Sequence, residues 1–385
     1  MFWVNFKFRD CVSVLDEGGN IDVIYCDIMK AFDQVPIDRL LRKVKSYGIK
    51  GSLLAWIGSF LKNRKMSVVI NGDKSSEGSV TSGVPQGSIL GPLLFTIYIN
   101  DMPIGINSLL FMFADDTKLF REIKNEDDNA YLQQDLDKLS DWSEIWKLKF
   151  HPGKCSVLHL GKTNRKTPYA LNGQVLQASS SEKDLGVQID DELRFDKHIQ
   201  AKTSKARQIW GMIRRSFTNI DTETFPLLFK ALVRPHLEYA NCVWSPRFQE
   251  QIDDIERVQR SATKQVPGLQ SMTYSERLRT LKLPTLKHRR RRGDLVETYK
   301  IVHQLYDKGA VPELNWIPAN SITRGHQFRM RPVLSRTKLG QSRFTSRKVN
   351  DWNSLPTDIV SASSLNSFKN QLDLYFADDP SVYNV

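Results

Sequence analysis

The sequence predicts an α+β fold in which a sheet domain is followed by a mostly helical domain. Three observations support this prediction. Short apolar, β-branched runs bounded by turn signals are concentrated in the first half of the chain. From Asp196 onward, apolar residues recur at helical spacing among basic ones. The length of 385 residues suits two or three domains, which we expect at residues 1–192, 193–292 and 293–385.

The first expected element is a buried strand at Ile21–Asp27, which is rich in β-branched and aromatic residues and follows the turn signal Gly18-Gly19-Asn20. A helix is predicted next, with apolar residues on one face between residues 40 and 47 and with Gly48 as its stop. A second helical pattern covers residues 53–61.

The next segments predict a strand, a loop and a helix. Met66–Asn71 has a strand pattern and ends at the turn signal Asn71-Gly72. Residues 83–91 are rich in Gly, Ser and Pro and are expected to form a loop. The apolar run at residues 92–99 then predicts a helix with proline in its first turn.

Residues 109–120 predict two short strands around a tight turn at Asp115-Asp116. A stripe of Leu and Trp at helical spacing over residues 132–146 predicts a helix that packs against the sheet and ends before Pro152-Gly153. Two further strands are expected, at residues 156–160 and 185–189.

Charge is distributed unevenly along the chain, whose formal net charge is +12. Residues 1–192 carry 23 Lys and Arg and 25 Asp and Glu, a net of −2, so residues 193–385 carry the remaining 32 and 18, a net of +14. This asymmetry indicates a polyanionic partner, with an ordinary basic surface as the alternative. The run Lys287–Arg292 is interpreted either as a nuclear-import or RNA-contact segment or as a solvated helix face.

The cysteines and the apolar segments indicate an intracellular protein of the nucleus or cytoplasm, with no membrane partner. The cysteines are too dispersed for a Cys-x-x-Cys motif, so we expect four reduced, buried thiols at Cys11, Cys26, Cys155 and Cys242. No window approaches the roughly 18 consecutive apolar residues of a membrane span. The apolar start Met1–Lys7 lacks the long apolar core and cleavage site of a signal peptide. The sequence specifies no oligomeric state.

Carboxylates stand at the ends of two predicted apolar strands. Asp27 ends the first strand, where an unpaired buried carboxylate is costly, and Asp115-Asp116 occupies the predicted hairpin turn. If these strands are neighbours in one sheet, the carboxylates meet at one edge, where hard oxygen ligands suit Mg²⁺. Two such ions about 3.5–4 Å apart would stabilise an in-line phosphoryl displacement. A solvated turn is the alternative for an isolated Asp-Asp pair.

Five short motifs in chain order resemble those of the reverse transcriptases of non-LTR retrotransposons (LINE elements), in the jockey-like branch. They are DIMKAFD at 27–33, GVPQGSILGP at 83–92, FADD at 113–116, FHPGKC at 150–155 and LGV at 185–187. The resemblance covers roughly residues 15–245. It implies a polymerase palm with residual fingers over residues 1–192, an antiparallel sheet with helices on one face. A helical thumb over 193–292 and a basic C-terminal region over 293–385 would follow.

The resemblance implies a role for each matching residue. Two Mg²⁺ ions, with Mn²⁺ as an alternative, would bind Asp27, Asp115 and Asp116, while Lys154 would protonate the leaving pyrophosphate. The residues implied to contact nucleotide or template are Ile28, Phe32, Pro85, Gln86 and Gly87. The implied primer grip is Leu185, Gly186 and Val187. The thumb residues implied to neutralise phosphates are Lys197, Lys202, Lys205, Arg214 and Arg215.

Less specific interpretations remain open for several of these residues. Core packing is the alternative for Phe32, a solvated lysine is the alternative for Lys154, and a solvated helix face is the alternative for the thumb residues. Asp33 is interpreted as structural because it lies past the end of the strand.

Together these features predict an RNA-directed DNA polymerase that adds deoxynucleotides to a DNA primer 3′-hydroxyl along an RNA template. Only 26 residues precede Asp27, so we expect most of the fingers, including the triphosphate clamp, and the amino-terminal endonuclease to be missing. The alternatives are a catalytically inactive remnant that only binds RNA or primer–template, and an unrelated α+β interaction protein.

Overall fold

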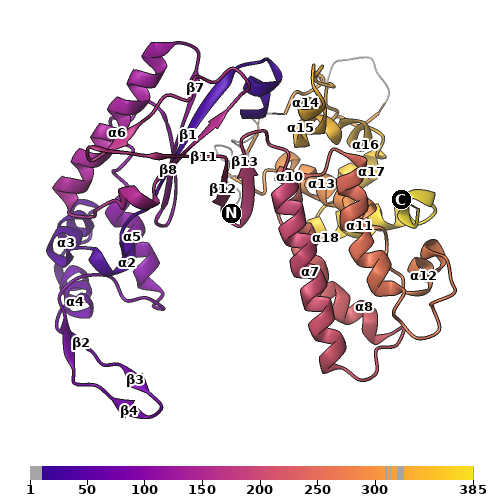
Figure 1. Cartoon of the computed structure of the whole chain (residues 1–385), viewed down its shortest axis with the longest axis horizontal. Helices are drawn as coiled ribbons and strands as arrows, with labels where there is room; N and C mark the ends of the chain where they lie inside the picture. The colour runs from indigo at the N-terminus through magenta and orange to yellow at the C-terminus, as the bar shows by residue number, and fades with distance from the viewer. Residues whose placement is uncertain (1–10, 308–310, 313, 319–324, 385) are drawn as a thin grey trace. The chain divides into compact units, whose positions relative to one another are not determined.

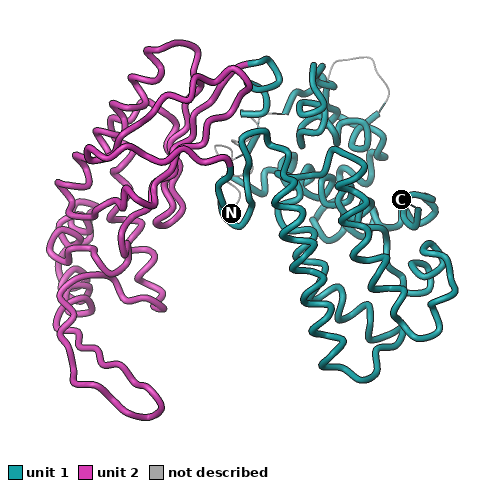
Figure 2. The backbone as a smooth tube through the Cα atoms, in the orientation of Figure 1, with its two compact units in different colours: residues 1–18, 181–385 teal, residues 19–180 magenta. Residues whose placement is uncertain are grey.

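The computed structural model describes residues 11–307, 311–312, 314–318 and 325–384. The described residues form two compact units, one of residues 19–180 and one that combines residues 11–18 with residues 181–384 (Figure 2). The first contains a five-stranded sheet and the second is largely helical (Figure 1), which confirms the predicted α+β class. The finer division at residues 193 and 293 stays a prediction. The expectation about Met1–Lys7 lies outside the described residues.

The central sheet of the 19–180 unit has the strand order β11-β8-β1-β7-β6. Strand β1 lies between β7 and β8 and is antiparallel to both. The sheet is mixed, so the expectation of an antiparallel sheet is wrong for one strand: β11 runs parallel to β8 at the edge of the sheet. The connection between these two strands is long enough to return the chain to the starting end of β8, as parallel pairing requires. The strands are β1 (Asn20–Cys26), β6 (Leu109–Phe113), β7 (Asp116–Ile123), β8 (Ser156–Leu160) and β11 (Gln177–Ser179).

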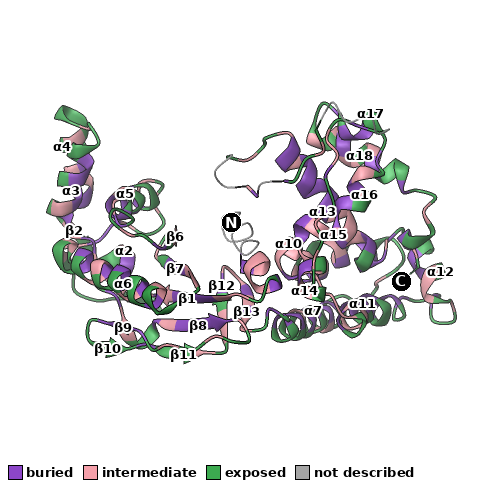
Figure 3. Ribbon diagram, turned by 90° about the horizontal axis from the view of Figure 1, so that it is seen from above, coloured by how far each residue is buried: buried purple, intermediate pink, exposed green. Residues whose placement is uncertain are grey.

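Helices cover one face of this sheet and share a hydrophobic core with it. Ile24, Leu119 and Val157 come from three neighbouring strands and are at most 1% exposed; Figure 3 shows the buried stretches of β1 and β8 in purple. The helices of this unit are α2 (Ala31–Gln34), α3 (Ile37–Ser46), α4 (Gly51–Leu61), α5 (Leu90–Ile99) and α6 (Glu126–Trp146), and a 3₁₀ turn, η1, spans Pro152–Lys154.

Helix α6 illustrates how local sequence sets an element of this core. Its N-terminus is capped by Asn125, whose side chain accepts a hydrogen bond from the backbone N–H of Asp128 at 3.1 Å. Lys147 has a left-handed φ of 56° and ends the helix. The predicted apolar stripe is confirmed as core, because Leu132, Leu136 and Leu139 are fully buried.

The predicted strand at residues 66–71 is interrupted. Strand β2 (Arg64–Met66) pairs with β5 (Gly78–Val80), and β3 (Val69–Ile70) pairs with β4 (Asp73–Lys74) around the expected Asn71-Gly72 turn. The β3–β4 ladder ends at Ser75, whose N–H donates to the Val68 carbonyl at 2.9 Å while its Oγ accepts from the Val68 N–H at 2.9 Å. A second small hairpin joins β9 (Ala170–Leu171) to β10 (Gln174–Val175).

The other unit begins with a hairpin and continues with helices. Its core includes Trp352 and Phe368, both fully buried. Its elements up to residue 302 are β12 (Ser181–Asp184), β13 (Val187–Asp190), α7 (Asp196–Ser216), α8 (Thr224–Leu228), the π-helical η2 (Phe229–Val233), α9 (Arg234–Glu238), α10 (Asn241–Trp244), α11 (Gln249–Thr263), α12 (Tyr274–Thr280) and α13 (Leu286–Val302). The remaining ones are α14 (Lys338–Ser342), α15 (Phe344–Arg347), α16 (Val349–Asn353), α17 (Thr357–Val360), α18 (Leu365–Tyr375) and η4 (Pro380–Val382).

Residues 11–18 are attached through Asp16 to residues 336 and 337, more than 300 positions later in the chain. Its carboxylate accepts hydrogen bonds from the Thr337 backbone N–H at 2.9 Å, the Thr337 hydroxyl at 2.6 Å and the Arg336 N–H at 3.2 Å. Burial alone would raise the pKa of Asp16, but the hydrogen bonds from Thr337 and Arg336 lower it. The segment therefore belongs to the unit formed with residues 181–384.

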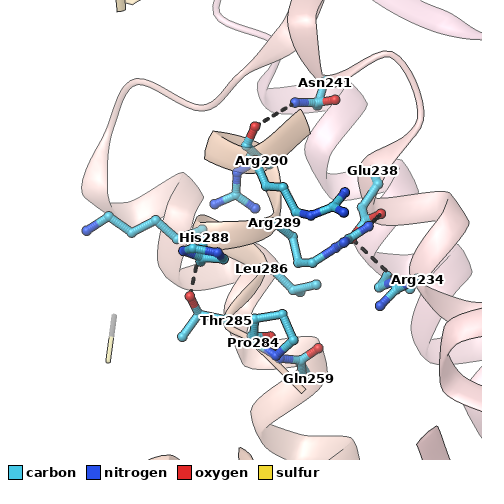
Figure 4. Close-up of polar contacts among 12 residues, drawn as sticks. Arg234, Glu238, Asn241, Gln259, Pro284, Thr285, Leu286, His288, Arg289 and Arg290 are labelled. Carbon is cyan, nitrogen blue, oxygen red and sulfur yellow. Dashed lines mark hydrogen bonds and ion pairs between the residues drawn. The ribbon is translucent and has the colours of Figure 1, made fainter. Parts of the chain in front are cut away.

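The basic run Lys287–Arg292 lies on α13, and the interpretation as a solvated helix face is wrong for most of it. Arg289 donates two hydrogen bonds to Glu238, at 2.8 and 2.9 Å (Figure 4). Arg291 bridges Asp351 and Asp379, and Arg292 pairs with Asp373. His288 and Arg290 are buried, which leaves Lys287 as the exposed residue of the run.

The cysteine and membrane expectations can be compared with the structure. All four cysteines are free thiols; Cys11, Cys26 and Cys155 are buried as expected, whereas Cys242 is only half-buried. No helix among the described residues combines the length and apolar character that crossing a membrane requires.

Candidate active site

Strand register brings the predicted carboxylates to one edge of the sheet. In the β1–β7 pair Cys26 lies opposite Thr117, and in the β6–β7 hairpin Phe113 lies opposite Asp116. Asp27 follows Cys26 and Asp116 precedes Thr117, so the two carboxylates occupy corresponding positions at the ends of adjacent strands. The strand before Asp27 is therefore a neighbour of β7, which begins at Asp116, and not of β6, the apolar strand before Asp115, because β7 lies between them.

The hairpin turn is displaced by one residue from its predicted position. Strand β7 begins at Asp116, so the turn residues are Ala114 and Asp115. Ala114 has a φ of 53°, a left-handed conformation that is uncommon for a residue with a Cβ. The pairing of Phe113 with Asp116 requires this tight turn, and it places Asp115 at the tip and Asp116 within the ladder.

The donor atoms at this edge fit a hard divalent cation. Among the described residues, no three side chains of His, Cys, Asp or Glu stand close enough together to form a complete protein-only metal site. Mg²⁺ is commonly held by one or two carboxylates together with substrate phosphates and water rather than by a protein cage. Asp27, whose side chain is 40% exposed, Asp115, which is half-buried, and Asp116, which is exposed, supply carboxylates of that kind.

Lys154 lies beside Asp27, with 3.7 Å between its Nζ and Asp27 Oδ2. The segment that carries it is fixed to the end of β1, because the His151 N–H donates to the Asp27 carbonyl oxygen at 2.8 Å. The Asp27 N–H donates to the Cys155 Sγ at 3.3 Å. Both ends of the Asp27 peptide unit are thus held, while the carboxylate and the ammonium remain accessible to solvent.

The glycine-rich loop is clamped onto α2, which follows Asp27 in the chain. The Gly83 N–H donates to the Val35 carbonyl at 2.8 Å and the Ser82 hydroxyl donates to the Asp33 carbonyl at 2.8 Å. Gly83 has a φ of +84°, and a Cβ there would lie 2.7 Å from the Asp33 backbone. Only glycine fits this close approach.

At the tip of this loop, Gln86 is exposed and donates a hydrogen bond from Nε2 to Asp33 Oδ1 at 3.2 Å. Gly87 follows with a φ of +82°, and Pro85 is half-buried. Asp33, which the sequence marked only as structural, therefore orients the side chain of Gln86.

Two further predicted contact residues lie between Asp27 and this loop in the chain. Phe32 is half-buried and stacks on Phe95 with 4.6 Å between ring centroids. Its backbone carbonyl accepts from the Val84 N–H at 2.7 Å. The side chain of Ile28 is buried, 3% exposed, so only its backbone is available to a ligand.

The predicted primer-grip residues belong to the other unit, at the turn between β12 and β13. Leu185 and Gly186 have φ values of 42° and 85°, which form a two-residue hairpin turn with left-handed residues at both positions. The Tyr239 hydroxyl donates to the Leu185 carbonyl at 2.8 Å. Val187 begins β13 and is buried, 3% exposed. The sequence did not identify Tyr239 as the residue that holds this turn.

The predicted phosphate-contact residues lie on α7. The buried stripe of this helix includes Ile199, Ala206 and Ile213. The basic residues lie away from it: Lys202 is half-buried, and the exposed ones are Lys197, Lys205, Arg214 and Arg215. A long helix that packs on one side and carries cations elsewhere has the surface expected of a nucleic-acid contact.

His198 couples the stability of this unit to pH. Burial, with a smaller contribution from Lys202, lowers the pKa of His198 to about 4, and its Nδ1 accepts a hydrogen bond from the Gln188 N–H at 3.1 Å. The unfolded chain takes up this proton near pH 6.5, so stability is retained above that pH and lost as pH falls toward 4, by about 3 kcal/mol.

We therefore expect His198→Asn, which keeps an acceptor near the Nδ1 position, to make the free energy of unfolding less dependent on pH. Between pH 6.5 and pH 4, unfolding of the variant should take up about one proton fewer than unfolding of the parent protein. Urea unfolding of both proteins over this range measures the difference. Parallel pH profiles for the variant and the parent protein would show that His198 is not the responsible group.

Comparison with known proteins places these features in a family context. The family profile described as Reverse transcriptase (RNA-dependent DNA polymerase) matches residues 6–196. The chain is 30% identical over 278 residues to the RNA-directed DNA polymerase from mobile element jockey of Drosophila melanogaster, in an alignment covering 68% of this chain and 30% of that protein. It is 28% identical over 307 residues to the probable RNA-directed DNA polymerase from transposon X-element of the same species, covering 75% and 34%.

The chain thus spans about 30% of the length of the jockey protein. Among solved structures, telomerase from Candida albicans in complex with a TWJ fragment of telomeric RNA aligns with a TM-score of 0.36 at 10% identity, covering 72% of this chain and 54% of that one.

Proposed function

Because the chain belongs to the reverse transcriptases of non-LTR retrotransposons, we propose that it copies RNA into DNA by adding deoxynucleotides to a primer 3′-hydroxyl. Proteins of this family generally use divalent metal ions. The observation that carries the proposal is the register of β1 against β7, which ends with Asp27 and Asp116 in corresponding positions. RNA template, DNA primer and deoxynucleoside triphosphate are the partners we propose.

Each residue has a defined part in the proposed reaction. Asp27 and Asp115 would hold both ions, and Asp116 would be a weaker ligand. When bound, two divalent ions stabilise the attacking and leaving oxygens of an in-line displacement. The primer 3′-oxygen forms a bond to the α-phosphorus, the bond from that phosphorus to the bridging oxygen breaks, and pyrophosphate leaves. The hydroxyl proton passes to solvent, and the Lys154 ammonium donates a proton to the pyrophosphate.

Nucleotide selection would come from the loop and α2. The edge of the half-buried Phe32 ring, fixed by its stacking on Phe95, is proposed to exclude a sugar 2′-hydroxyl. Gln86 would contact the nucleotide and template, with Pro85 and Gly87 shaping the loop around it. The backbone of Ile28 would lie near the triphosphate. In the other unit, Leu185, Gly186 and Val187 would support the primer strand.

Primer extension tests the proposal directly. The full chain is incubated with an RNA template, an annealed DNA primer, deoxynucleotides and Mg²⁺, in parallel with a reaction chelated by EDTA and with Asp115→Asn as the background. We expect extension only in the complete wild-type reaction. Wild-type extension no greater than that of Asp115→Asn would exclude polymerase activity for this chain.

Asp33 provides a separate prediction, because it positions Gln86 without touching the reacting atoms. We expect Asp33→Ala to raise KM for deoxynucleotide by about 5- to 10-fold, which corresponds to the roughly 1–1.4 kcal/mol of a typical intramolecular hydrogen bond, with a smaller change in kcat. Asp33→Asn retains an acceptor oxygen and should restore KM. A loss in kcat alone, or no rescue by asparagine, would indicate a general folding role instead.

The exposed basic residues of α7 favour a second candidate function, which is binding of RNA or primer–template without polymerisation. Neutralisation of phosphates releases counterions, so log K should fall linearly with log salt. If this candidate alone is correct, a labelled RNA–DNA hybrid binds with such a slope while primer extension stays at background. If log K does not depend on log salt, the basic residues of α7 do not bind phosphates, and neither candidate function depends on them.

A further inference from the structure

A pocket in the 181–384 unit is lined by an unusual excess of basic groups. Its volume is about 310 Å³, which lies at the lower end of the about 300–1,000 Å³ typical of small-ligand sites. The walls come from α13, from the α15–α16 region and from the segments near residues 245 and 381. The basic residues that line it are Lys287, His288, Arg290, Arg291, Arg347 and Lys348, against the acidic Asp294 and Asp351.

The two acidic residues of the pocket are already engaged. Asp294 accepts hydrogen bonds from Arg347 Nε at 2.7 Å and Nη2 at 2.8 Å. Asp351 accepts from Arg291 Nη2 at 2.8 Å, and the other arm of Arg291 reaches Asp379 at 2.9 Å. These five charged groups are therefore engaged with one another within the protein, whereas neither Lys287 nor Arg290 lies within ion-pair distance of a carboxylate among the described residues.

Arg290 is the central basic group of the pocket and forms no ion pair among the described residues. It is 5% exposed, its Nη1 is buried without a hydrogen-bond partner, and none of the carboxylates in the described part of the chain lies within ion-pair distance of it. Figure 4 shows Arg290 beside Arg289 on α13, with the Asn241 side chain at the Arg290 carbonyl. Its neighbour Arg289 forms an ion pair with Glu238, so of these two successive arginines one is paired with a carboxylate and the other is not.

The nearby carboxylate Glu256 does not supply the missing partner. Glu256 is fully buried, and it accepts hydrogen bonds from the backbone N–H groups of Leu286 and Lys287 at 3.1 and 3.3 Å. Burial lowers the pKa of Arg290 to about 10, against the smaller attraction of Glu256, Asp294 and Glu238, so its guanidinium is still charged at neutral pH. A buried guanidinium without a partner is costly, and an anion that enters the pocket would relieve this cost.

We propose that this pocket binds a phosphate group, with Arg290 at its base and the exposed Lys287 at its mouth. A guanidinium offers a fork of donors that matches two phosphate oxygens, while a lysine ammonium acts as a point charge. His288, 6% exposed with an unpartnered Nδ1, supplies a further polar group to the wall. The phosphate is that of a nucleic-acid backbone or that of a free nucleotide. The site goes beyond the proposed polymerisation, because it needs neither metal ion nor nucleotide transfer.

Thermal unfolding of the full chain tests the site. We compare inorganic phosphate with chloride at equal ionic strength, without Mg²⁺ or deoxynucleotides, for wild type, Arg290→Met and Lys287→Gln. The matched control is Arg257→Gln, which removes a charge from the exposed surface of α11, where the Arg257 side chain is 62% exposed. Phosphate should raise the melting temperature of wild type and of the control, while Arg290→Met should weaken phosphate binding on the order of 10- to 100-fold.

A second measurement distinguishes the two sources of phosphate. If the ligand is a backbone phosphodiester, Arg290→Met reduces the slope of log K against log salt for a labelled single-stranded RNA by about one. If it is a free nucleotide, the RNA slope is unchanged and the variant loses affinity for a 5′-mononucleotide. An equal phosphate response in wild type and Arg290→Met overturns the proposal. If Arg290→Met does not fold, Lys287→Gln decides, and a wild-type response from it overturns the proposal as well.

Discussion

Replacing Asp27 by asparagine is expected to reduce primer extension by about 1,000-fold or more. The change preserves the shape of the side chain but removes the negative charge that holds two cations near the developing charge of the displacement. Loss of a single preorganised electrostatic contact typically costs about 10²–10³ in kcat, and Asp27 is proposed to serve both ions. The same reasoning predicts a comparable loss for Asp115→Asn and a smaller one for Asp116→Asn.

Stability should not account for this loss. The Asp27 side chain is 40% exposed and its ion pair with Lys154 is long, at 3.7 Å, so the pair contributes little to folding. We therefore expect the melting temperature of Asp27→Asn to equal that of wild type. Asp73→Asn, at the exposed strand β4, removes the same charge from the same unit and should leave extension within about twofold of wild type. Activity of Asp27→Asn within about tenfold of wild type would contradict its role as a ligand of both ions.

The second large effect is expected at Arg347, a member of the basic C-terminal region. Arg347 is the bidentate partner of Asp294, whose side chain is 8% exposed. Arg347→Met removes one partner and leaves a buried carboxylate without its counterion, which typically costs about 3–5 kcal/mol. Urea unfolding followed by fluorescence of the tryptophans in the 181–384 unit should show this loss, while the 19–180 unit is unaffected.

A double variant separates the ion pair from general packing. Arg347→Met combined with Asp294→Asn removes both charges, so at least half of the lost stability should return. Arg257→Gln breaks an exposed ion pair with Asp254 and should change the free energy of unfolding by less than about 1 kcal/mol. A loss below about 1 kcal/mol in Arg347→Met, or no recovery in the double variant, would show that the pair does not anchor this region.

Local patterns predicted the elements of the 19–180 unit well. The apolar run that ends at Cys26, the Leu and Trp stripe of α6 and the strand at Ser156–Leu160 were each expected from residue spacing. These elements form where local preference and burial agree, since one face of every one of them lies in a common core. The hairpin of β6 and β7 was also expected, but its turn lies at Ala114-Asp115, because cross-strand pairing rather than turn propensity decides which residues close it.

The hydrogen bonds of Asp33 and Tyr239 had no comparable local signal. Asp33 orients Gln86 from 53 residues away in the chain, and Tyr239 holds the Leu185 turn from 54 residues away. Asp33 lies in the quoted DIMKAFD motif, but spacing along the chain does not show which group either side chain meets. Similarly, the run Lys287–Arg292 has one composition and three environments: exposed, buried without an ion-pair partner, and ion-paired.

By itself, the sequence determined the α+β class, the order of the motifs and the carboxylates of the candidate site, because periodicity, turn chemistry and carboxylate placement are local properties. Tertiary structure alone decided which arginines of α13 are neutralised, that Asp16 joins the unit of Thr337, and that Arg290 lies buried without a carboxylate. The physical reason is that burial and ion pairing depend on groups far apart in the chain, whose meeting no local pattern encodes.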